Sequence, residues 1–538
     1  MGEKKEHEQA ASFIKGAVLL GVAGVLVKIL GAFFRIPLGN FLGPEGMSYY
    51  VSAYPMYNFF IVLATAGLPT ALAKIISEQR ATGHLADINR TFKAGMILMS
   101  TIGLVGAIIM FFGADLIVKI IKNEGALYSF KALGPGIFIV SLLAVFRGYF
   151  QGHQNLKPFA ISQLVEQLGR VIVGYTLAVV LLKYGQNVSA AGATFGATAG
   201  ALVGFIYVFS VFIKFKKRNN YPKESQDSEA VKSIFKRILK IAIPITMGAA
   251  VMPIMNSIDV MLVMNRLHDI GLGEKANDLY GMLSGYAATL VNLPQVVTAA
   301  IQISIVPAIA GLYVAQNRKT LHTTIESGVR MGLIISLPAA AGLIVLAQPI
   351  MELLYPRQIE YAQTTGSILS ILGFTVIFMG LFQVTTGILQ GLSLQNRPAI
   401  NLAVGAAFKI VLTYVLVGIP AFNIYGAAIS TVTAFAVATT LNMVTLKKRA
   451  AITFPFKRVL LKPMVSTFVM AIAVYTLYSG LSLISISRIN TVISVSVGIL
   501  IYGIMLFALQ TFDDADFALI PGGRKLKAIN QWFVRKKD

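Results

Sequence analysis

Two cations in the first apolar stretch of the chain, Lys28 and Arg35, have the clearest potential for chemistry. A charge in the middle of a membrane-crossing helix costs about 2.5–3.5 kcal/mol on insertion scales, so each one needs a reason. In a helix of 3.6 residues per turn, both cations fall on one face together with Gly21, Gly24 and Gly31. The glycines leave that face shallow, so the two cations could hold an anionic group, such as a diphosphate, at the wall of a cavity. Alternatively, the glycines serve close helix packing, Lys28 pairs with a carboxylate and Arg35 extends to the outer surface.

A second charged group lies in the fifth apolar stretch, where Glu166 and Arg170 are four residues apart. This spacing puts the two side chains within ion-pairing reach on one helical face. We expect the pair to bind substrate or to shape or gate a cavity; the alternative is that it locks helices together. Arg147, at the end of the preceding stretch, could cap an inner gate, although contact with lipid headgroups is the preferred interpretation.

Two further charges stand alone inside apolar stretches, Asp259 and Lys409. Asp259 could bind a coupling proton or cation, or form a salt bridge. Lys409 aligns roughly with Arg170 across an internal repeat described below, which favours a shared architectural position over a unique site.

Enzyme chemistry is not indicated by any motif. There is no cysteine, the five histidines are not spaced as metal ligands, and no nucleophile–base arrangement or phosphate-binding loop is present. Asp513, Asp514 and Asp516 could suggest a metal site, but a solvated helix end is the preferred interpretation. We therefore expect a transporter that is not an enzyme and that holds no metal and no cofactor, with a coupling ion (H⁺ or Na⁺) or the membrane potential as the energy source.

Composition places all of these residues in a membrane. Of the 538 residues, 56% are hydrophobic and 13% are charged, and a soluble protein of this size could not hide so much apolar side chain. The net charge of +23 comes from short segments between apolar runs, which indicates an anionic membrane surface and not nucleic acid.

The apolar runs predict an all-α integral membrane protein with 14 transmembrane helices, since each is long enough to cross a bilayer. Most of the Lys and Arg fall in connections that share one side with residues 1–12, which we interpret as a cytosolic tail and not a signal peptide. Both termini are therefore expected to be cytoplasmic. The predicted spans are 13–35, 48–73, 92–113, 131–150, 159–182, 189–213, 238–263, 279–313, 328–347, 365–390, 399–419, 424–446, 459–480 and 489–510.

The chain also repeats itself. The motif GYFQGHQNLKP at 148–158 corresponds to GILQGLSLQNRP at 387–398, and Leu68-Pro69 corresponds to Leu293-Pro294. Six spans per copy predict two parallel six-helix repeats around a central cavity, plus two extra C-terminal helices. The predicted domains are an N-lobe at 13–213, a cytosolic linker at 214–237, a C-lobe at 238–446, the last two helices with their preceding loop at 447–510 and a cytosolic tail at 511–538.

Four segments carry a family resemblance: GAFFRIPLGNFLGPEGMSYY at 31–50, ATAGLPTALAKIISEQ at 64–79, RGYFQGHQNLKPFAISQLVEQLGR at 147–170 and NLPQVVTAAIQISIVPAIA at 292–310. They resemble the polysaccharide-transport branch of the MOP flippase superfamily, in particular SpoVB-like and MurJ-like proteins, over nearly the whole chain. The resemblance implies a bacterial plasma-membrane flippase that carries undecaprenyl-diphosphate-linked glycans, such as the peptidoglycan precursor lipid II, by alternating access.

The resemblance also bears on the site residues. It implies that Lys28 and Arg35 face the central cavity and serve the diphosphate, with Lys where the family has Arg in the first position. Where MurJ-like proteins carry further cavity arginines, this chain has Asn58 and, in the eighth span, Ala288 and Thr289. Either Glu166 and Arg170 compensate, or the substrate differs.

We therefore predict a flippase for lipid-linked oligosaccharide or peptidoglycan precursors, working as a monomer among membrane lipids and without nucleic acid. The closest alternative is a cation-coupled small-molecule or multidrug exporter of the same superfamily. A membrane-embedded glycosyltransferase and a channel are the remaining alternatives, and a channel is disfavoured because two unequal lobes provide no ring of identical pore residues.

Overall fold

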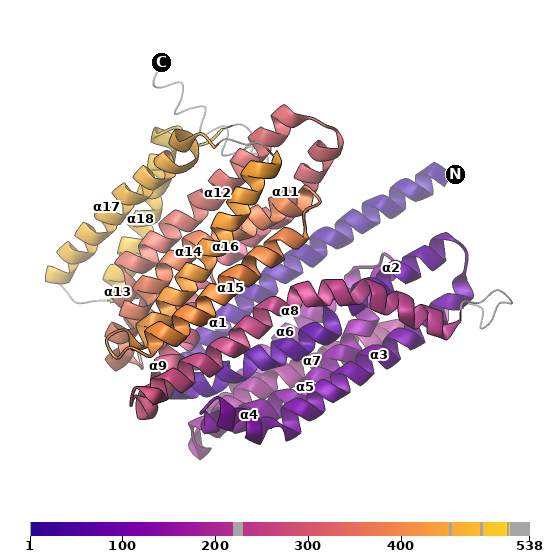
Figure 1. The fold of residues 1–538 in the computed structure, drawn as a ribbon, viewed down its shortest axis with the longest axis horizontal. Coiled ribbons are helices and arrows are strands. Elements are labelled where there is room, and N and C mark those ends of the chain that lie inside the picture. Colours follow the sequence, from indigo (N-terminus) through magenta and orange to yellow (C-terminus); the bar gives the residue numbers. More distant parts are fainter. Residues whose placement is uncertain (1, 219–229, 451–453, 485–487, 514–515, 517–538) are drawn as a thin grey trace. The chain divides into compact units, whose positions relative to one another are not determined.

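The computed structural model describes residues 2–218, 230–450, 454–484, 488–513 and 516, and within these ranges every regular element is a helix (Figure 1). Thirteen helical segments of the described chain are long and apolar enough to cross a membrane. This confirms the predicted all-α membrane fold. The centre of the predicted linker at 214–237, most of the predicted tail at 511–538, and Asp514 lie outside the described residues.

The first helix, α1, spans Gly2–Thr65 and is interrupted at Gly43. There φ is 68° and ψ is 176°, a backbone conformation that only glycine adopts readily. Pro44 follows and has no N–H with which to continue the helix. The predicted spans 13–35 and 48–73 lie on opposite sides of this break, and the first from Leu19 onward and all of the second fall within a single candidate segment, Leu19–Ala81. The count of fourteen stays a prediction.

The chain packs into two compact units. Unit 1 comprises Met1–Asn265 and Gly273–Gly281, and unit 2 comprises Arg266–Leu272 and Met282–Asp538. In unit 1, α1 is followed by α2 (Leu68–Ala81), α3 (Leu85–Phe112), α4 (Ala114–Ile120), α5 (Leu127–Gly152), α6 (Lys157–Leu181), α7 (Gln186–Arg218), α8 (Val231–Asp269, as far as Asn265) and α9 (Ala276–Tyr280). Unit 2 contains a π-helical turn (Gly281–Ala287, from Met282), α10 (Ala288–Val291), α11 (Gln295–Val314), α12 (Arg318–Val345), α13 (Ala347–Leu354), α14 (Ala362–Gly391), α15 (Asn396–Val417), α16 (Asn423–Ala450), α17 (Lys462–Ile484) and α18 (Arg488–Ala508).

Helix α8 begins the predicted C-lobe, yet most of it lies in unit 1. Its residues Ile234, Ile238 and Ala242 are buried in the apolar core of unit 1, with Leu72 of α2 and Phe146 of α5. This packing accounts for its place in the unit. The lobe boundaries at 13–213 and 238–446 stay a prediction.

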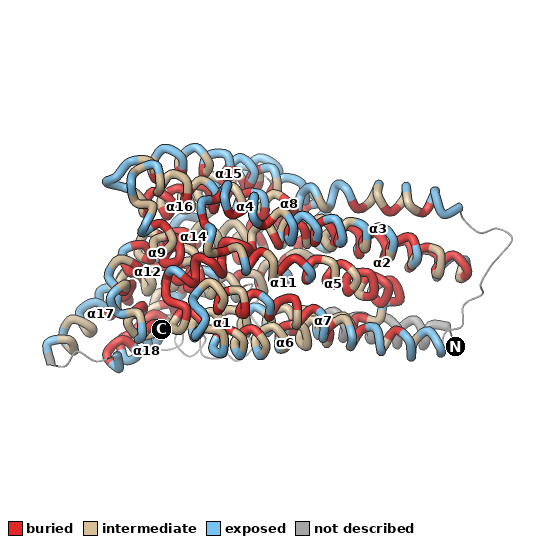
Figure 2. Tube along the Cα trace, turned by 90° about the horizontal axis from the view of Figure 1, so that it is seen from below, coloured by how far each residue is buried: buried red, intermediate tan, exposed pale blue. Residues whose placement is uncertain are grey.

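Both units have the same order of neighbouring helices. In unit 1, α5 packs between α3 and α7, and α7 packs on α6; in unit 2, α14 packs between α12 and α16, and α16 packs on α15. The central helix α5 is buried along most of its length (Figure 2). The predicted six-helix repeat requires such matching neighbours.

The motif at 148–158 brings α5 into close contact with α2. A Cβ atom added to Gly148 would lie 2.9 Å from the carbonyl oxygen of Pro69, and one added to Gly152 would lie 2.9 Å from that of Ala73. Only glycine lets the two backbones approach so closely.

The motif at 387–398 does the same for α14 and α11 in unit 2. Added Cβ atoms at Gly387 and Gly391 would lie 2.9 Å from the carbonyl oxygens of Gln302 and Val306, respectively. Each of these helix pairs involves a helix that starts at a Leu-Pro pair: Leu68-Pro69 are the first two residues of α2, and Leu293-Pro294 directly precede α11.

Both motifs then leave their helix by the same turn. Gln154 (φ 56°) and Ser393 (φ 61°) adopt the left-handed conformation. The next residue in each case donates its N–H back to the end of the helix, Asn155 to Phe150 O at 3.0 Å and Leu394 to Leu389 O at 2.8 Å. The two sequence motifs therefore have the same local structure.

Candidate substrate-binding site

A charged triad lies inside unit 1 between α5 and α6. Nη2 of Arg147 is 2.9 Å from Oε2 of Glu166, and Nη2 of Arg170 is 3.6 Å from Oε1 of the same carboxylate. The three side chains are only 12%, 24% and 15% exposed for Arg147, Arg170 and Glu166. Two arginines against one glutamate leave the triad with one surplus positive charge.

The triad follows from the helical spacing of α6. Ser162, Glu166 and Arg170 are four residues apart in turn, so they line one face of the helix. Arg147 reaches this face from α5: its Nε donates to Ser162 Oγ at 2.9 Å, and its guanidinium lies 5.3 Å from the ring centre of Phe159. The preferred interpretation of Arg147 as a headgroup contact is therefore not what the structure shows.

Arg170 also lies beside three tyrosines of α1, Tyr50, Tyr54 and Tyr57. The hydroxyls of Tyr54 and Tyr57 and the Nε of Arg170 are buried, and none of the three has a hydrogen-bond partner among the described residues. An unsatisfied buried polar atom costs about 1–3 kcal/mol. These atoms are therefore places where a water molecule or a polar substrate group would bind favourably.

The part of α1 that precedes the break at Gly43 packs along α6. A Cβ atom added to Gly31 would lie 3.3 Å from Nε2 of Gln167, and one added to Gly174 would lie 3.2 Å from Cζ of Phe34. Gly31 lies between Lys28 and Arg35 on the predicted face. The contact therefore brings the face with the two cations to the helix that carries Glu166.

The two cations themselves remain uncompensated. Lys28 is exposed and Arg35 is half-buried, and neither forms an ion pair with any residue that the structure describes. No atom lies within 4 Å of a Cβ added at Gly21 or Gly24. Close packing therefore explains Gly31, but it does not explain the other two glycines of this face.

The remaining predicted site residues are more dispersed. Asn58 is exposed on α1, and Asp259 is half-buried on α8, both within unit 1. Lys409 is buried on α15 in unit 2. A role in substrate binding, gating or ion coupling stays a prediction for each predicted site residue.

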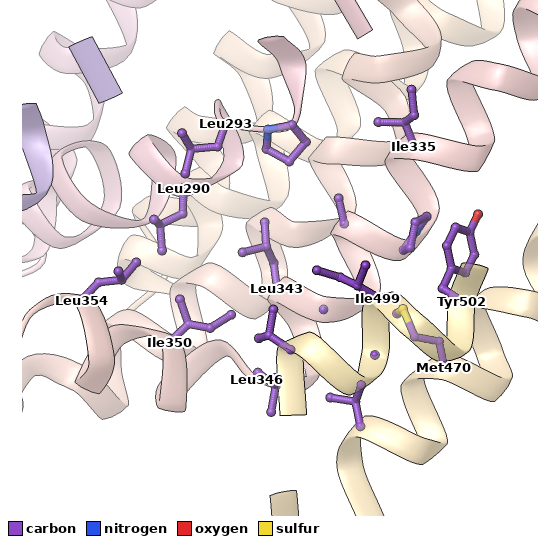
Figure 3. A pocket seen from close by; sticks show the side chains of 17 residues that line it. Leu290, Leu293, Ile335, Leu343, Leu346, Ile350, Leu354, Met470, Ile499 and Tyr502 are labelled. Carbon is purple, nitrogen blue, oxygen red and sulfur yellow. The ribbon is translucent and has the colours of Figure 1, made fainter. Parts of the chain in front are cut away.

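Unit 2 contains an apolar groove that sequence reasoning did not find. It is a partly open cavity of about 430 Å³ lined by residues of α10, the α10–α11 connection, α12, α13, α17 and α18. Side chains such as Leu290, Leu343, Met470 and Ile499 converge on it (Figure 3). Its one polar side chain is Tyr502, whose hydroxyl donates to Ile334 O at 2.8 Å. The lining comes from segments more than 200 residues apart, so no local pattern signals it.

A buried ion cluster in unit 2 was also missed. Arg330 of α12 is 1% exposed and binds Asp516, which is fully buried, and Asp513, which is 41% exposed. The interpretation of these acids as a solvated helix end is therefore wrong for Asp516. Three acids close together just beyond the last span were the available signal, and the missing fact was a cation in a distant helix.

Comparison with known proteins points to one family. A family model described as polysaccharide biosynthesis protein matches residues 13–313, more than half of the chain, and the MatE model matches residues 283–415. Stage V sporulation protein B of Bacillus subtilis is 28% identical over 449 residues, which cover 83% of this chain and 86% of that protein. The lipid II flippase MurJ of Bacillus subtilis is 26% identical over 485 residues, which cover 86% of this chain and 88% of that protein.

Solved structures share the fold. The lipid II flippase MurJ in an inward closed conformation matches with a TM-score of 0.70 at 19% identity, covering 91% of this chain and 98% of that one. An inward-facing multidrug resistance MATE family transporter of the MOP superfamily matches with a TM-score of 0.66 at 17% identity, covering 79% and 94%.

Proposed function

Because the chain belongs to the polysaccharide biosynthesis protein family, within the MOP superfamily, we propose that it flips a lipid-diphosphate-linked oligosaccharide or peptidoglycan precursor across the bacterial plasma membrane by alternating access. Membership confirms the resemblance inferred from the sequence. The chain is accordingly a membrane transporter and not an enzyme.

The observation that carries the choice of substrate is the pair of uncompensated cations on α1. Lys28 and Arg35 have no acidic partner among the described residues, and the face they share packs at Gly31 against α6, where Arg147 and Arg170 outnumber Glu166. Such a surplus of positive charge suits a diphosphate, which accepts charge-assisted hydrogen bonds from both ammonium and guanidinium groups. It disfavours a cationic drug.

The apolar groove of unit 2 supports a substrate with a long hydrocarbon tail. Lipid tails are as apolar as leucine, so the transfer of a polyprenyl tail from the bilayer into the groove gains little hydrophobic free energy. Its use lies in giving a polyprenyl tail a dry path within the protein, since its single polar side chain, Tyr502, already has its hydroxyl bonded to Ile334 O.

A flipping assay with the purified protein tests the proposal. In proteoliposomes containing lipid II labelled on its headgroup, we expect the protein to move label from the inner leaflet to the outer one, where an impermeant quencher reaches it. Protein-free vesicles should protect about half of the label. Protection that stays the same with well-incorporated protein would contradict the proposal for lipid II.

A multidrug exporter is the second candidate, supported by the MatE match and by the fold shared with a MATE family transporter. In that case Asp259 would bind the coupling ion. Efflux of a cationic dye that requires an H⁺ or Na⁺ gradient, without any flipping of lipid II, would favour this candidate. For the flippase we propose the same ions or the membrane potential as energy source, no cofactor, and a monomer as the working unit.

Labelling of introduced cysteines tests the proposed orientation, with both termini cytoplasmic. The chain has no cysteine, so the variants Gln186→Cys and His84→Cys carry no background. Both residues are exposed: Gln186 is the first residue of α7, and His84 lies in the α2–α3 connection. We expect an impermeant maleimide added to whole cells to label the cysteine at 186 and to reach the one at 84 only after the membrane is opened. The reverse pattern would invert the topology.

A further inference from the structure

The ion cluster of unit 2 ties the chain beyond α18 to the middle of α12. Nε and Nη2 of Arg330 donate to the two carboxylate oxygens of Asp516 at 3.0 and 2.8 Å, and Nη1 lies 2.8 Å from Oδ2 of Asp513. The two-pronged contact fixes orientation as well as distance, because the planar guanidinium matches the carboxylate. We call Arg330, Asp513 and Asp516 the clasp.

The acidic side of the clasp is itself held in shape. The N–H of Asp513 donates to Oδ2 of Asp516 at 2.8 Å, and the N–H of Asp516 donates to the carbonyl of Asp513 at 3.0 Å. Nearby, Nζ of Lys462, at the start of α17, donates to the carbonyl of Gln510 at 2.7 Å. The clasp thus holds the segment that follows α18 against α12, and the Lys462 bond joins the same segment to the start of α17.

Helices α17 and α18 should move together if the clasp is broken. A Cβ atom added to Gly498 of α18 would lie 2.6 Å from Cγ2 of Val474 of α17, so the two helices are in close contact. Along α12, the residue one turn beyond Arg330 is Ile334, whose carbonyl accepts the hydroxyl of Tyr502 from α18. The hydrogen bond from Tyr502 to Ile334 is thus a second contact beside the clasp, and it joins α18 directly to α12.

The region where α18 contacts α12 borders the apolar groove. Ile335 and Pro338 of α12 and Ile499 and Tyr502 of α18 are among its lining residues, and Figure 3 shows Ile335, Ile499 and Tyr502. The spacing of α12 and α18 therefore contributes to the width of the groove, and the clasp holds the segment after α18 against α12.

We propose that Arg330 and Asp516 are positioning residues that set the width of the apolar groove, and thereby the protein's preference for a long polyprenyl tail. The inference rests on the proposed function, in which the groove receives the tail. Neither residue lines the groove, so both act through the placement of α18.

The test compares substrates that differ only in their tails. Proteoliposomes carry lipid-diphosphate-linked glycans with either a full-length polyprenyl tail or a short one, and the flipping rates are measured for wild type, Asp516→Asn and Arg458→Ala. Asn keeps the shape of Asp516 and removes its charge. Arg458 is a matched control, since its Nη1 lies 4.0 Å from Asp513 but its side chain is 65% exposed.

We expect Asp516→Asn to lower the long-to-short rate ratio about fivefold or more, and Arg458→Ala to leave it unchanged. A loss of folded protein would lower both rates together and leave the ratio unchanged, as would a purely structural role. An unchanged ratio in Asp516→Asn overturns the proposal.

A second measurement does not require transport. Spin labels on cysteines introduced at Ile335 of α12 and Ile499 of α18, both lining the groove, should report a longer or broader distance distribution in Asp516→Asn than in wild type. The same distribution in both would overturn the proposal. Should wild type flip no lipid-linked glycan with either tail, the proposed function fails, and this distance still decides whether the clasp sets the groove.

Discussion

Flipping of lipid-linked diphosphate should fall by about two orders of magnitude or more in the double variant Lys28→Ala/Arg35→Ala. A hydrogen bond to a charged group contributes about 1.5–3 kcal/mol, and 1.4 kcal/mol corresponds to a tenfold change. Each single variant should therefore lose roughly tenfold or more. The measurement is the initial flipping rate of lipid II in proteoliposomes at matched protein content.

Two controls separate binding from insertion. Lys28→Arg keeps the charge and should retain most of the rate. Lys183→Ala removes an exposed cation of the α6–α7 connection and should leave the rate unchanged. A double variant that inserts normally and flips at the wild-type rate would show that the cations do not serve the substrate.

The physical reason for the prediction is the location of Lys28. The Lys28 side chain is exposed on the surface of the structure. It lies seven residues, or about 10 Å along the helix, from Arg35, within the same apolar stretch. An ammonium facing acyl chains at such a depth would cost a few kcal/mol, whereas one facing a water-accessible cavity costs little. A lipid-facing Lys28 would make Lys28→Ala stabilising without changing the flipping rate.

Replacing Arg330 by Ala should destabilise the protein strongly, by about 3–5 kcal/mol. It leaves the fully buried carboxylate of Asp516 without its cation, and removing one partner of a buried pair costs far more than removing both. We expect a clear fall in the melting temperature of the protein in detergent.

The double variant Arg330→Met/Asp516→Leu provides the contrast, because apolar residues of similar volume often replace a buried ion pair without loss. It should recover much of the stability that Arg330→Ala loses. Arg458→Ala, which removes a mostly exposed cation, should change stability by less than about 1 kcal/mol. Melting of Arg330→Ala at the wild-type temperature would mean that Asp516 is hydrated or protonated in the folded protein.

Sequence reasoning was most successful where a single helix carries the information. The apolar runs predicted the helices, and the spacing of Glu166 and Arg170 predicted their ion pair, because both follow from the helical repeat. The corresponding motifs at 148–158 and 387–398 correctly pointed to equivalent local structures for the same reason.

It was least successful where partners lie on different helices. Arg147 joins Glu166 from α5, and Arg330 joins Asp516 across 186 residues of sequence. Residue spacing says nothing about which helices become neighbours, so Arg147 was assigned to the membrane surface and Asp516 to solvent. The apolar groove escaped notice likewise, since leucine, isoleucine and methionine in a membrane helix indicate no pocket until the helices are packed.

The glycine contacts of α5 with α2 and of α14 with α11 restrict how the protein can move. Carbonyl oxygens and side chains such as Pro69, Ile76 and Ile309 fill the space where the other helix lacks a Cβ atom, so the helices of each pair cannot slide past one another without steric clashes. Each pair of helices should therefore move as one rigid body. Any change of shape that accompanies transport is thereby confined to looser joints, such as the break at Gly43, where a single backbone rotation can swing a whole arm of α1.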